Sequence, residues 1–197
     1  MSGHGSRLAA SRRKGVYLYA RDGSTGSWGL ETVIAPPEPN IGFGGGVALH
    51  GDHLAVVAEH DGTMGTNYGA LFVMQRNSTT GVWGVVRKII PSGAMGALSV
   101  TIHGDGLGMT VAMEDDTLVI GSFRHDGPAG RDQGAAWVFY RHANGTDGWG
   151  EVAKLRTSDG AANNGLGVAV SISGDVIAAG APRRGKPRRS LGVLVNP

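Results

Sequence analysis

Few residues in this sequence have the types and spacing that chemistry requires. His50 and His53 lie on either side of Gly51-Asp52, and two histidines so close together could form part of a metal site. The side chains of a tight hairpin turn usually point into solvent, so we interpret this pair as turn residues. The chain has no cysteine, which excludes disulfides, thiolate zinc sites and cysteine nucleophiles.

The common signatures of hydrolysis and phosphoryl transfer are absent from the sequence. It contains no His-Glu-x-x-His, Gly-x-Ser-x-Gly or Gly-Lys-Ser/Thr motif. Gly42-x-Gly44 and Gly104-x-Gly106 are similar to phosphate-binding loops, but no helical pattern follows whose N-terminus could bind the phosphate. We therefore predict that the chain is not an enzyme.

The composition predicts a folded chain of short strands. Of the 197 residues, 41% are hydrophobic, as in ordinary globular proteins, and 35 are glycine, which favours many tight turns. The net charge of +2 is small, and its basic clusters at residues 12–14 and 183–189 are typical of solvated tails, so we expect no nucleic-acid partner. We expect residues 1–14 to form a basic disordered tail without a signal sequence. No apolar run is long enough to span a bilayer, so no direct membrane insertion is expected.

One strand pattern recurs along the chain at a period of about 55 to 65 residues. Its copies begin at the glycines in positions 15, 69, 134 and 192. The first three copies are each followed by a polar turn and a tryptophan-glycine pair, at residues 28–29, 83–84 and 149–150. A repeat of this kind predicts stacked supersecondary units.

Each period also contains a hairpin whose strands alternate apolar and polar residues, as half-buried strands do. The predicted hairpins cover residues 42–49 with 54–58, residues 107–112 with 118–121, and residues 166–172 with 176–182. Together with the recurring strand, they predict an all-β protein.

The hairpins resemble FG-GAP repeats, as in the integrin α N-terminal-like β-propeller. The resemblance rests on Phe43-Gly44, on Leu107-Gly108 and Leu166-Gly167 at the same position, and on Gly180-Ala181-Pro182. It covers residues 15–197 and implies β-propeller blades of four antiparallel strands. The expected repeats are residues 15–68, 69–133 and 134–190, with a partial fourth from residue 191.

These repeats make a partial propeller of about three blades. The phasing predicts two complete blades, preceded by an outer pair of strands and followed by a blade that stops after its third strand. A closed ring needs about four to eight blades. The chain would then be a fragment or half of an assembly, and its open blade edges would favour self-association.

Integrin-type repeats that bind calcium carry several spaced acids in one loop, because calcium needs about six to eight oxygen ligands. The corresponding acids here occur singly or in pairs beside turn residues, which explains them as turn formers. They are Asp52, Asp105, Asp115, Asp116 and Asp175. We expect no cofactor, and the loops do not support calcium.

The resemblance implies a non-enzymatic binding or adhesion module that contacts a protein or glycan through loops at one face. Those loops cover residues 59–68, 123–133 and 183–190, and long, varied loops of this kind often carry binding residues. The candidate ligand-binding residues are Asp61, Tyr68, Arg124, His125, Asp126, Arg131 and Asp132. Two alternatives remain open: a structural spacer without a specific ligand, and an accessory propeller of an enzyme whose catalytic domain lies elsewhere.

Asn77-Ser78-Thr79 and Asn144-Gly145-Thr146 match the acceptor pattern for N-glycosylation. Both occur between the recurring strand and its tryptophan. They favour an extracellular or cell-surface glycoprotein, as part of a longer protein. Turn preference also explains them, because Asn, Ser, Thr and Gly all favour turns.

Overall fold

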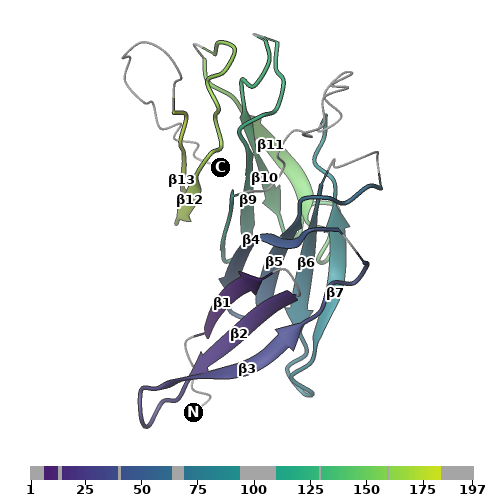
Figure 1. The fold of residues 1–197 in the computed structure, drawn as a ribbon, viewed down its shortest axis with the longest axis vertical. Helices are drawn as coiled ribbons and strands as arrows, with labels where there is room; N and C mark the ends of the chain where they lie inside the picture. Colours follow the sequence, from purple (N-terminus) through teal and green to yellow (C-terminus); the bar gives the residue numbers. More distant parts are fainter. Residues whose placement is uncertain are drawn as a thin grey trace.

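The computed structural model describes residues 7–12, 15–39, 41–63, 69–93, 110–128, 130–158 and 160–182. These residues form four antiparallel sheets that follow one another along the chain, and Figure 1 shows them side by side. We number the sheets blades 1 to 4. The protein is all-β, with β-propeller blades of four strands, as the sequence predicted.

Blades 2 and 3 are complete, and each runs from its first strand to its last in chain order. Blade 2 consists of β4 (Phe43–His50), β5 (His53–Ala58), β6 (Ala70–Arg76) and β7 (Trp83–Ile89). Blade 3 consists of β8 (Thr110–Glu114), β9 (Thr117–Ser122), β10 (Ala135–Tyr140) and β11 (Gly150–Leu155). The prediction of two complete blades is confirmed.

The outer two blades have fewer strands among the described residues. Blade 1 consists of β1 (Arg7–Arg12), β2 (Gly15–Arg21) and β3 (Trp28–Ile34). Blade 4 is the hairpin of β12 (Val170–Ser173) and β13 (Val176–Ala179). The strand predicted from residue 191 and the Leu107-Gly108 pair lie outside the described residues.

The register shows which positions are equivalent from blade to blade. Blades 1, 2 and 3 each have one irregularity in the pairing of their last two strands, after Leu18, Val73 and Val138. The tryptophans at 28 and 83 lie opposite Arg21 and Arg76, and the backbone N–H of Trp149 donates to the carbonyl of Arg141 at 3.0 Å. The tryptophan-glycine repeat therefore marks the same structural position in three blades.

The hydrophobic core lies between blades, because each sheet presents alternate side chains to its two neighbours. In blade 2, Val56 and Phe72 pack in the cluster shared with blade 1, and Val57 and Leu71 pack in the cluster shared with blade 3. A third cluster, around Leu166, joins blades 3 and 4. Burying one such large side chain stabilises the fold by about 1.5–3 kcal/mol, so each blade depends on its neighbours.

The prediction of a disordered tail at residues 1–14 is wrong for residues 7–12, which form β1. This strand pairs with β2 from Arg7 opposite Ala20 to Arg12 opposite Gly15. Ala9 packs against the cluster between blades 1 and 2. Arg7 also forms an ion pair with Glu31 on β3, at 2.8 Å. Tertiary contacts therefore order a segment whose composition is that of a tail.

The predicted hairpins form in blades 2 and 4 and, for the described part, in blade 3. The last hairpin is shorter than predicted, because β12 begins at Val170 rather than at residue 166. Leu166 instead forms a parallel bridge with Gly134 of blade 3. Within the part of the chain that the structure describes, no helix has the length and apolar character needed to span a bilayer.

Candidate functional site

The loops of the structure divide between two ends. Because neighbouring strands are antiparallel, the connections β5–β6, β9–β10 and β11–β12 all leave the blades at one end, which we call the loop end (upper part of Figure 1). The short turns β4–β5, β8–β9 and β12–β13 lie at the opposite end, the turn end. The described parts of the predicted binding loops at 59–68 and 123–133 therefore share the loop end, whereas the predicted loop at 183–190 lies outside the described residues.

Two loops of different blades are joined into one surface at the loop end. The backbone N–H groups of Asn163, Gly165 and Leu166 donate to the carbonyls of Arg131, Asp132 and Gln133, at 2.8, 3.1 and 3.1 Å. Gln133 is buried beneath this contact. We call residues 123–133 and 160–166 the loop platform. Three cross-loop hydrogen bonds give it a defined backbone between blades 3 and 4.

The platform holds two arginines at the surface. Arg124 is exposed, and its guanidinium lies over the ring of Phe123 with 5.2 Å between the guanidinium carbon and the ring centroid. The Arg131 side chain is 64% exposed, and its Nε lies 3.9 Å from the carboxylate of Asp132. Asp126 accepts a hydrogen bond from the backbone N–H of Asp132 at 2.9 Å. These four predicted residues lie together, and both arginine side chains are exposed at the surface.

His125 does not share this exposure, although the sequence predicted a ligand contact for it. Its side chain is 2% exposed, and its ring meets the edge of Trp137 with the centroids 5.1 Å apart. The imidazole packs below the platform. This packing places His125 between the loop that carries Arg124 and the core residue Trp137.

Asp61 is also buried, at 1% exposure, although the sequence predicted a ligand contact. Its carboxylate lies 2.6 Å from Nζ of Lys88 and accepts a hydrogen bond from the backbone N–H of Thr63 at 3.0 Å. Burial alone would raise the pKa of Asp61, but the hydrogen bonds from Lys88 and Thr63 outweigh it and hold the pKa below its usual value. Asp61 is thus an ionised anchor of the β5–β6 loop.

Asp61 and His125 occupy the same position of successive blades. Their backbone N–H groups donate to the carbonyls of Ala58 and Ser122, both at 3.3 Å, and their own carbonyls accept from the glycines that precede β6 and β10. Each lies where a lysine approaches an aromatic ring: Lys88 over Phe72 in blade 2, and Lys154 over Trp137 in blade 3. Asp61 and His125 each lie three residues after the second strand of their blade. Aligning the blades by this position could have indicated their shared supporting role. Tyr68 lies outside the described residues.

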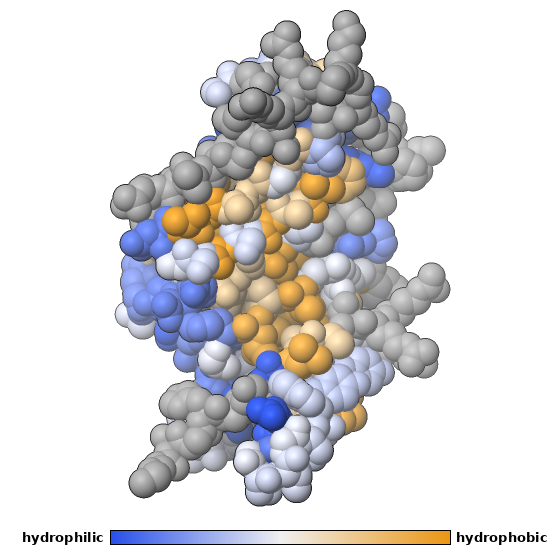
Figure 2. Space-filling model, turned by 90° about the vertical axis from the view of Figure 1, so that its left-hand side faces the viewer, coloured by the Kyte–Doolittle hydropathy of each residue, from blue (hydrophilic) through white to orange (hydrophobic). Residues whose placement is uncertain are grey.

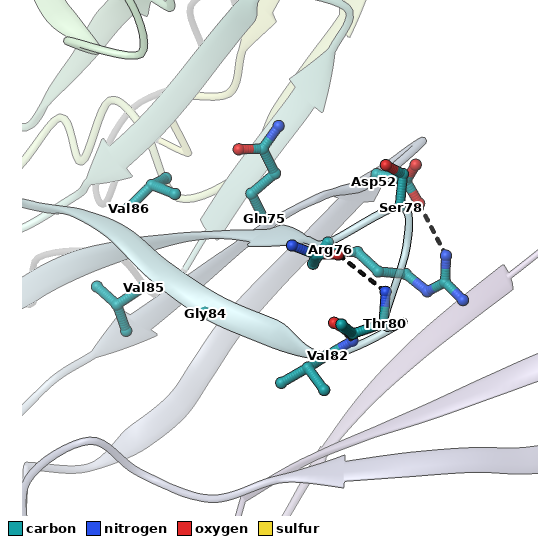
Figure 3. Close-up of a pocket in the computed structure, with 10 residues that line it drawn as sticks. Asp52, Gln75, Arg76, Ser78, Thr80, Val82, Gly84, Val85 and Val86 are labelled. Carbon is teal, nitrogen blue, oxygen red and sulfur yellow. Dashed lines mark hydrogen bonds and ion pairs between the residues drawn. The ribbon is translucent and has the colours of Figure 1, made fainter.

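The turn end carries a groove that the sequence analysis missed. It has a volume of about 610 Å³ and lies beside the β6–β7 turn, as Figure 3 shows. Asp52 and Arg76 supply charge there, 3.8 Å apart, and Val82, Val85 and Val86 supply an apolar wall. No sequence motif marks this groove, because Asp52 of the β4–β5 turn meets residues of β6, β7 and their turn only in the folded chain.

The charges beside this groove join blade 1 to blade 2. Glu31 of blade 1 accepts from Arg7 at 2.8 Å and lies 3.6 Å from Nε of Arg76. Asp52 lies 3.5 Å from Arg7 and 3.8 Å from Arg76. Two arginines and two carboxylates thus alternate across the boundary between blades 1 and 2. These ion pairs join the two blades, which explains the four residues as structural contacts.

The glycosylation candidates lie in exposed turns between the third and fourth strands of their blades. The side-chain oxygen of Asn77 accepts hydrogen bonds from the backbone N–H groups of Thr79 and Thr80, both at 2.9 Å. Asp22 has the same role in blade 1, where hydrogen bonds from Ser24 and Thr25 lower its pKa to about 2. Asn144 adopts a left-handed backbone, with φ of 66°. The hydrogen bonds of the turn therefore explain the asparagine at position 77 without glycosylation.

The acids weighed as calcium ligands lie in the two-residue hairpin turns at residues 51–52, 115–116 and 174–175, whereas Asp105 lies outside the described residues. Within the described ranges, no group of three or more histidine and acidic residues is placed to bind a metal ion.

Comparison with known proteins agrees with this geometry. The family model of the FG-GAP repeat matches residues 83–139 and 149–192, which is more than half of the chain. The chain belongs to the FG-GAP repeat family. No curated protein matches it significantly.

A solved structure, the periplasmic gluconolactonase PpgL of Pseudomonas aeruginosa, is similar to the chain with a TM-score of 0.48 and 16% sequence identity. The alignment covers 89% of this chain and 46% of the gluconolactonase. The chain therefore spans about half the length of that structure.

Proposed function

We propose that this chain is a non-enzymatic binding module of a larger surface or secreted protein, and that it contacts a protein or glycan through the loop platform. The observation that supports this most is the platform itself, in which hydrogen bonds between blades fix the backbone and leave Arg124 and Arg131 exposed. A fixed backbone reduces the entropy that is lost on binding.

The exposed groups suit recognition of carboxylates and hydroxyls. Arginine presents a planar fork of donors that matches a carboxylate, and the nearby Asp126 and Asp132 can accept hydrogen bonds from hydroxyl or amide groups. A protein surface or an acidic glycan offers both kinds of partner. No nucleic acid and no cofactor is part of this proposal.

The experiment is a screen of residues 1–197 on a glycan array and on a library of extracellular protein domains, followed by affinity measurements with variants. Arg124→Ala and Arg131→Ala should each weaken binding to the best hit by about tenfold, which corresponds to loss of one charged hydrogen bond. Arg87→Ala is the matched control, because Arg87 is an exposed arginine on β7 outside the platform. Equal binding by all three variants would contradict the proposal.

A structural spacer is the second candidate function. The observation in its favour is the series of contacts between blades, from the four-charge network at Arg7 to the buried clusters. If the screen finds no ligand while the chain remains folded, the spacer becomes the better account.

The exposed turns of Asn77 and Asn144 support the extracellular part of the proposal. Expression through a secretory pathway followed by intact mass measurement tests it, because each occupied site adds the mass of a glycan.

A further inference from the structure

Blade 1 exposes an apolar face. The equivalent faces of blades 2 and 3 are buried against the preceding blade. The side chains on this face point away from blade 2, because they alternate with Val16 and Leu18, which pack toward blade 2. Leu8 is 53% exposed and Trp28 is 49% exposed. We call this surface the open face of blade 1.

The repeats show what normally covers such a face. Leu8 lies opposite Tyr19 as Leu54 lies opposite Met74, and Leu54 is fully buried against blade 1. Trp28 is equivalent to Trp149, which is 2% exposed and packs in the cluster between blades 2 and 3. In both cases the covering element is the preceding FG-GAP blade. The open face of blade 1 is therefore shaped to receive a blade.

The last hairpin presents the complementary surface. Ala178 of β13 points away from blade 3, and it is exposed. The equivalent residues Ala55 and Val119 are fully buried against the next blade. Val176 on the same face is 48% exposed. Within the described residues, blade 1 thus exposes the face that a preceding blade covers elsewhere, and the last hairpin exposes the face that a following blade covers elsewhere.

Both ends of the array lie toward the same side of the molecule. Blade 1 lies at the lower left and the β12–β13 hairpin at the upper left of Figure 1. Figure 2 looks onto this left-hand side and shows a broad band of apolar residues across it. A partner on this side could contact both ends at once.

We propose that a second copy of this chain occupies this side, with the open face of blade 1 of each copy packed on the β12–β13 hairpin of the other. Each chain contributes four sheets, so two copies bring eight sheets together. A closed propeller has about four to eight blades. The contact is head-to-tail, and with two copies it closes into a ring.

The size of the contact explains why both ends must take part. The β12–β13 hairpin limits the size of each contact, because two strands of four residues cover roughly 13 Å by 10 Å, or about 130 Å², at about 3.3 Å per residue and about 4.8 Å per strand. This is well below the roughly 800 Å² per partner of a stable interface, so one such contact would be weak. Closing the ring uses two such contacts for each pair of chains, which favours a dimer over an open chain of copies.

The test is light scattering behind size exclusion on residues 1–197 over a range of micromolar concentrations. The wild-type chain should have the mass of a dimer, whereas Trp28→Glu and Ala178→Glu should each be monomeric with unchanged circular dichroism. Val152→Glu is the control and should remain dimeric, because Val152 is 45% exposed on the outermost strand of blade 3.

Mixing the two monomeric variants tests the head-to-tail arrangement. One of the two contacts in the mixed pair joins a wild-type Trp28 to a wild-type Ala178, so the mixture should associate more strongly than either variant alone. A monomeric wild-type chain would overturn the proposal. Another protein or another segment would then be the occupant of the open face. A dimer that both variants leave intact would also overturn it. If Trp28→Glu fails to fold, Ala178→Glu on the exposed hairpin still decides the outcome.

Discussion

Nδ1 of His50, at the end of the first strand of blade 2, accepts a hydrogen bond from the backbone N–H of Asp115 in the turn of blade 3, at 2.9 Å. The relationship recurs one blade later, where a carboxylate oxygen of Glu114 accepts from the backbone N–H of Gly174 at 2.8 Å. In each pair, the residue before a hairpin turn contacts the first turn residue of the next blade. The turn end is therefore linked by a repeated clasp between blades.

We predict that Glu114→Ala lowers the free energy of unfolding by about 1 kcal/mol, because it removes one hydrogen bond and leaves an N–H of Gly174 to water. His50→Ala should have a similar effect at the preceding boundary. Urea denaturation followed by tryptophan fluorescence measures both. Ser173→Ala is the control, since Ser173 holds the same position in the last described hairpin, and a loss as large as that of Glu114→Ala would contradict the clasp.

The buried ion pair predicts a larger effect in the β5–β6 loop. Asp61→Ala leaves Lys88 without its closest partner, and breaking a buried pair from one side costs about 3 kcal/mol. Glu38→Gln is the matched control, because Glu38 is the half-exposed partner of the same lysine and its loss should cost less than about 1 kcal/mol. Thermal unfolding compares the two, and equal losses would contradict the burial of the pair.

The same pair predicts a pH dependence. The pKa of Asp61 is lower in the folded state than in the unfolded chain, so its stabilising contribution is present above the unfolded pKa of about 3.9 and is lost as the pH falls through the folded value. Asp61→Asn should therefore lose less stability than the wild-type chain between neutral and acidic pH. Urea midpoints at a series of pH values measure this, and parallel curves for the two proteins would contradict it.

The glycine before β10 lies where the backbones of the two platform loops come close together, so a substitution there tests this contact. Gly134 has φ of 80°, and a Cβ there would collide with the backbone of Leu166. Gly134→Ala should therefore destabilise the chain more than Gly145→Ala, which has φ of 99° but open space around its Cβ and should lose only the about 1–2 kcal/mol of a left-handed residue. Equal melting temperatures for the two variants would show that the contact between the loops is dispensable.

The turn at Asn77 separates glycosylation from folding. Asn77→Asp keeps the side-chain oxygen that Asp22 uses in blade 1, so it should remove any glycan at this position without loss of stability. Asn77→Ala should remove the glycan and also cost about 1 kcal/mol for the lost turn hydrogen bonds. Intact mass and thermal melts of secreted protein distinguish them, and a melting temperature of Asn77→Asp as low as that of Asn77→Ala would contradict the turn role.

The blades could be predicted from sequence because their signals are local and repeated. The apolar run at residues 54–58 and the tryptophan-glycine pair after each of the first three copies of the recurring strand are readable without tertiary information. Strand β1 was missed because residues 7–12 have the composition of a basic tail, and only pairing with β2 and the ion pair to Glu31 order them.

The sequence indicated the loops that carry the candidate residues but not which of these residues are exposed. Arg124 and Arg131 lie at the surface as expected, whereas Asp61 and His125 have the same polar, loop-like sequence context and are buried. Their burial depends on Lys88 and Trp137, which are close in space but distant in sequence. Hydropathy alone therefore could not separate the exposed residues of these loops from the buried ones.

Hydrogen–deuterium exchange of the chain with and without the best hit of the binding screen tests the central claim most directly. The proposed function predicts slower exchange on binding in residues 123–133 and 160–166, with no change at the turn end in residues 51–52 and 77–86. Protection confined to residues 77–86, beside the groove of Asp52 and Arg76, would contradict binding through the loop platform and assign the contact to the turn end.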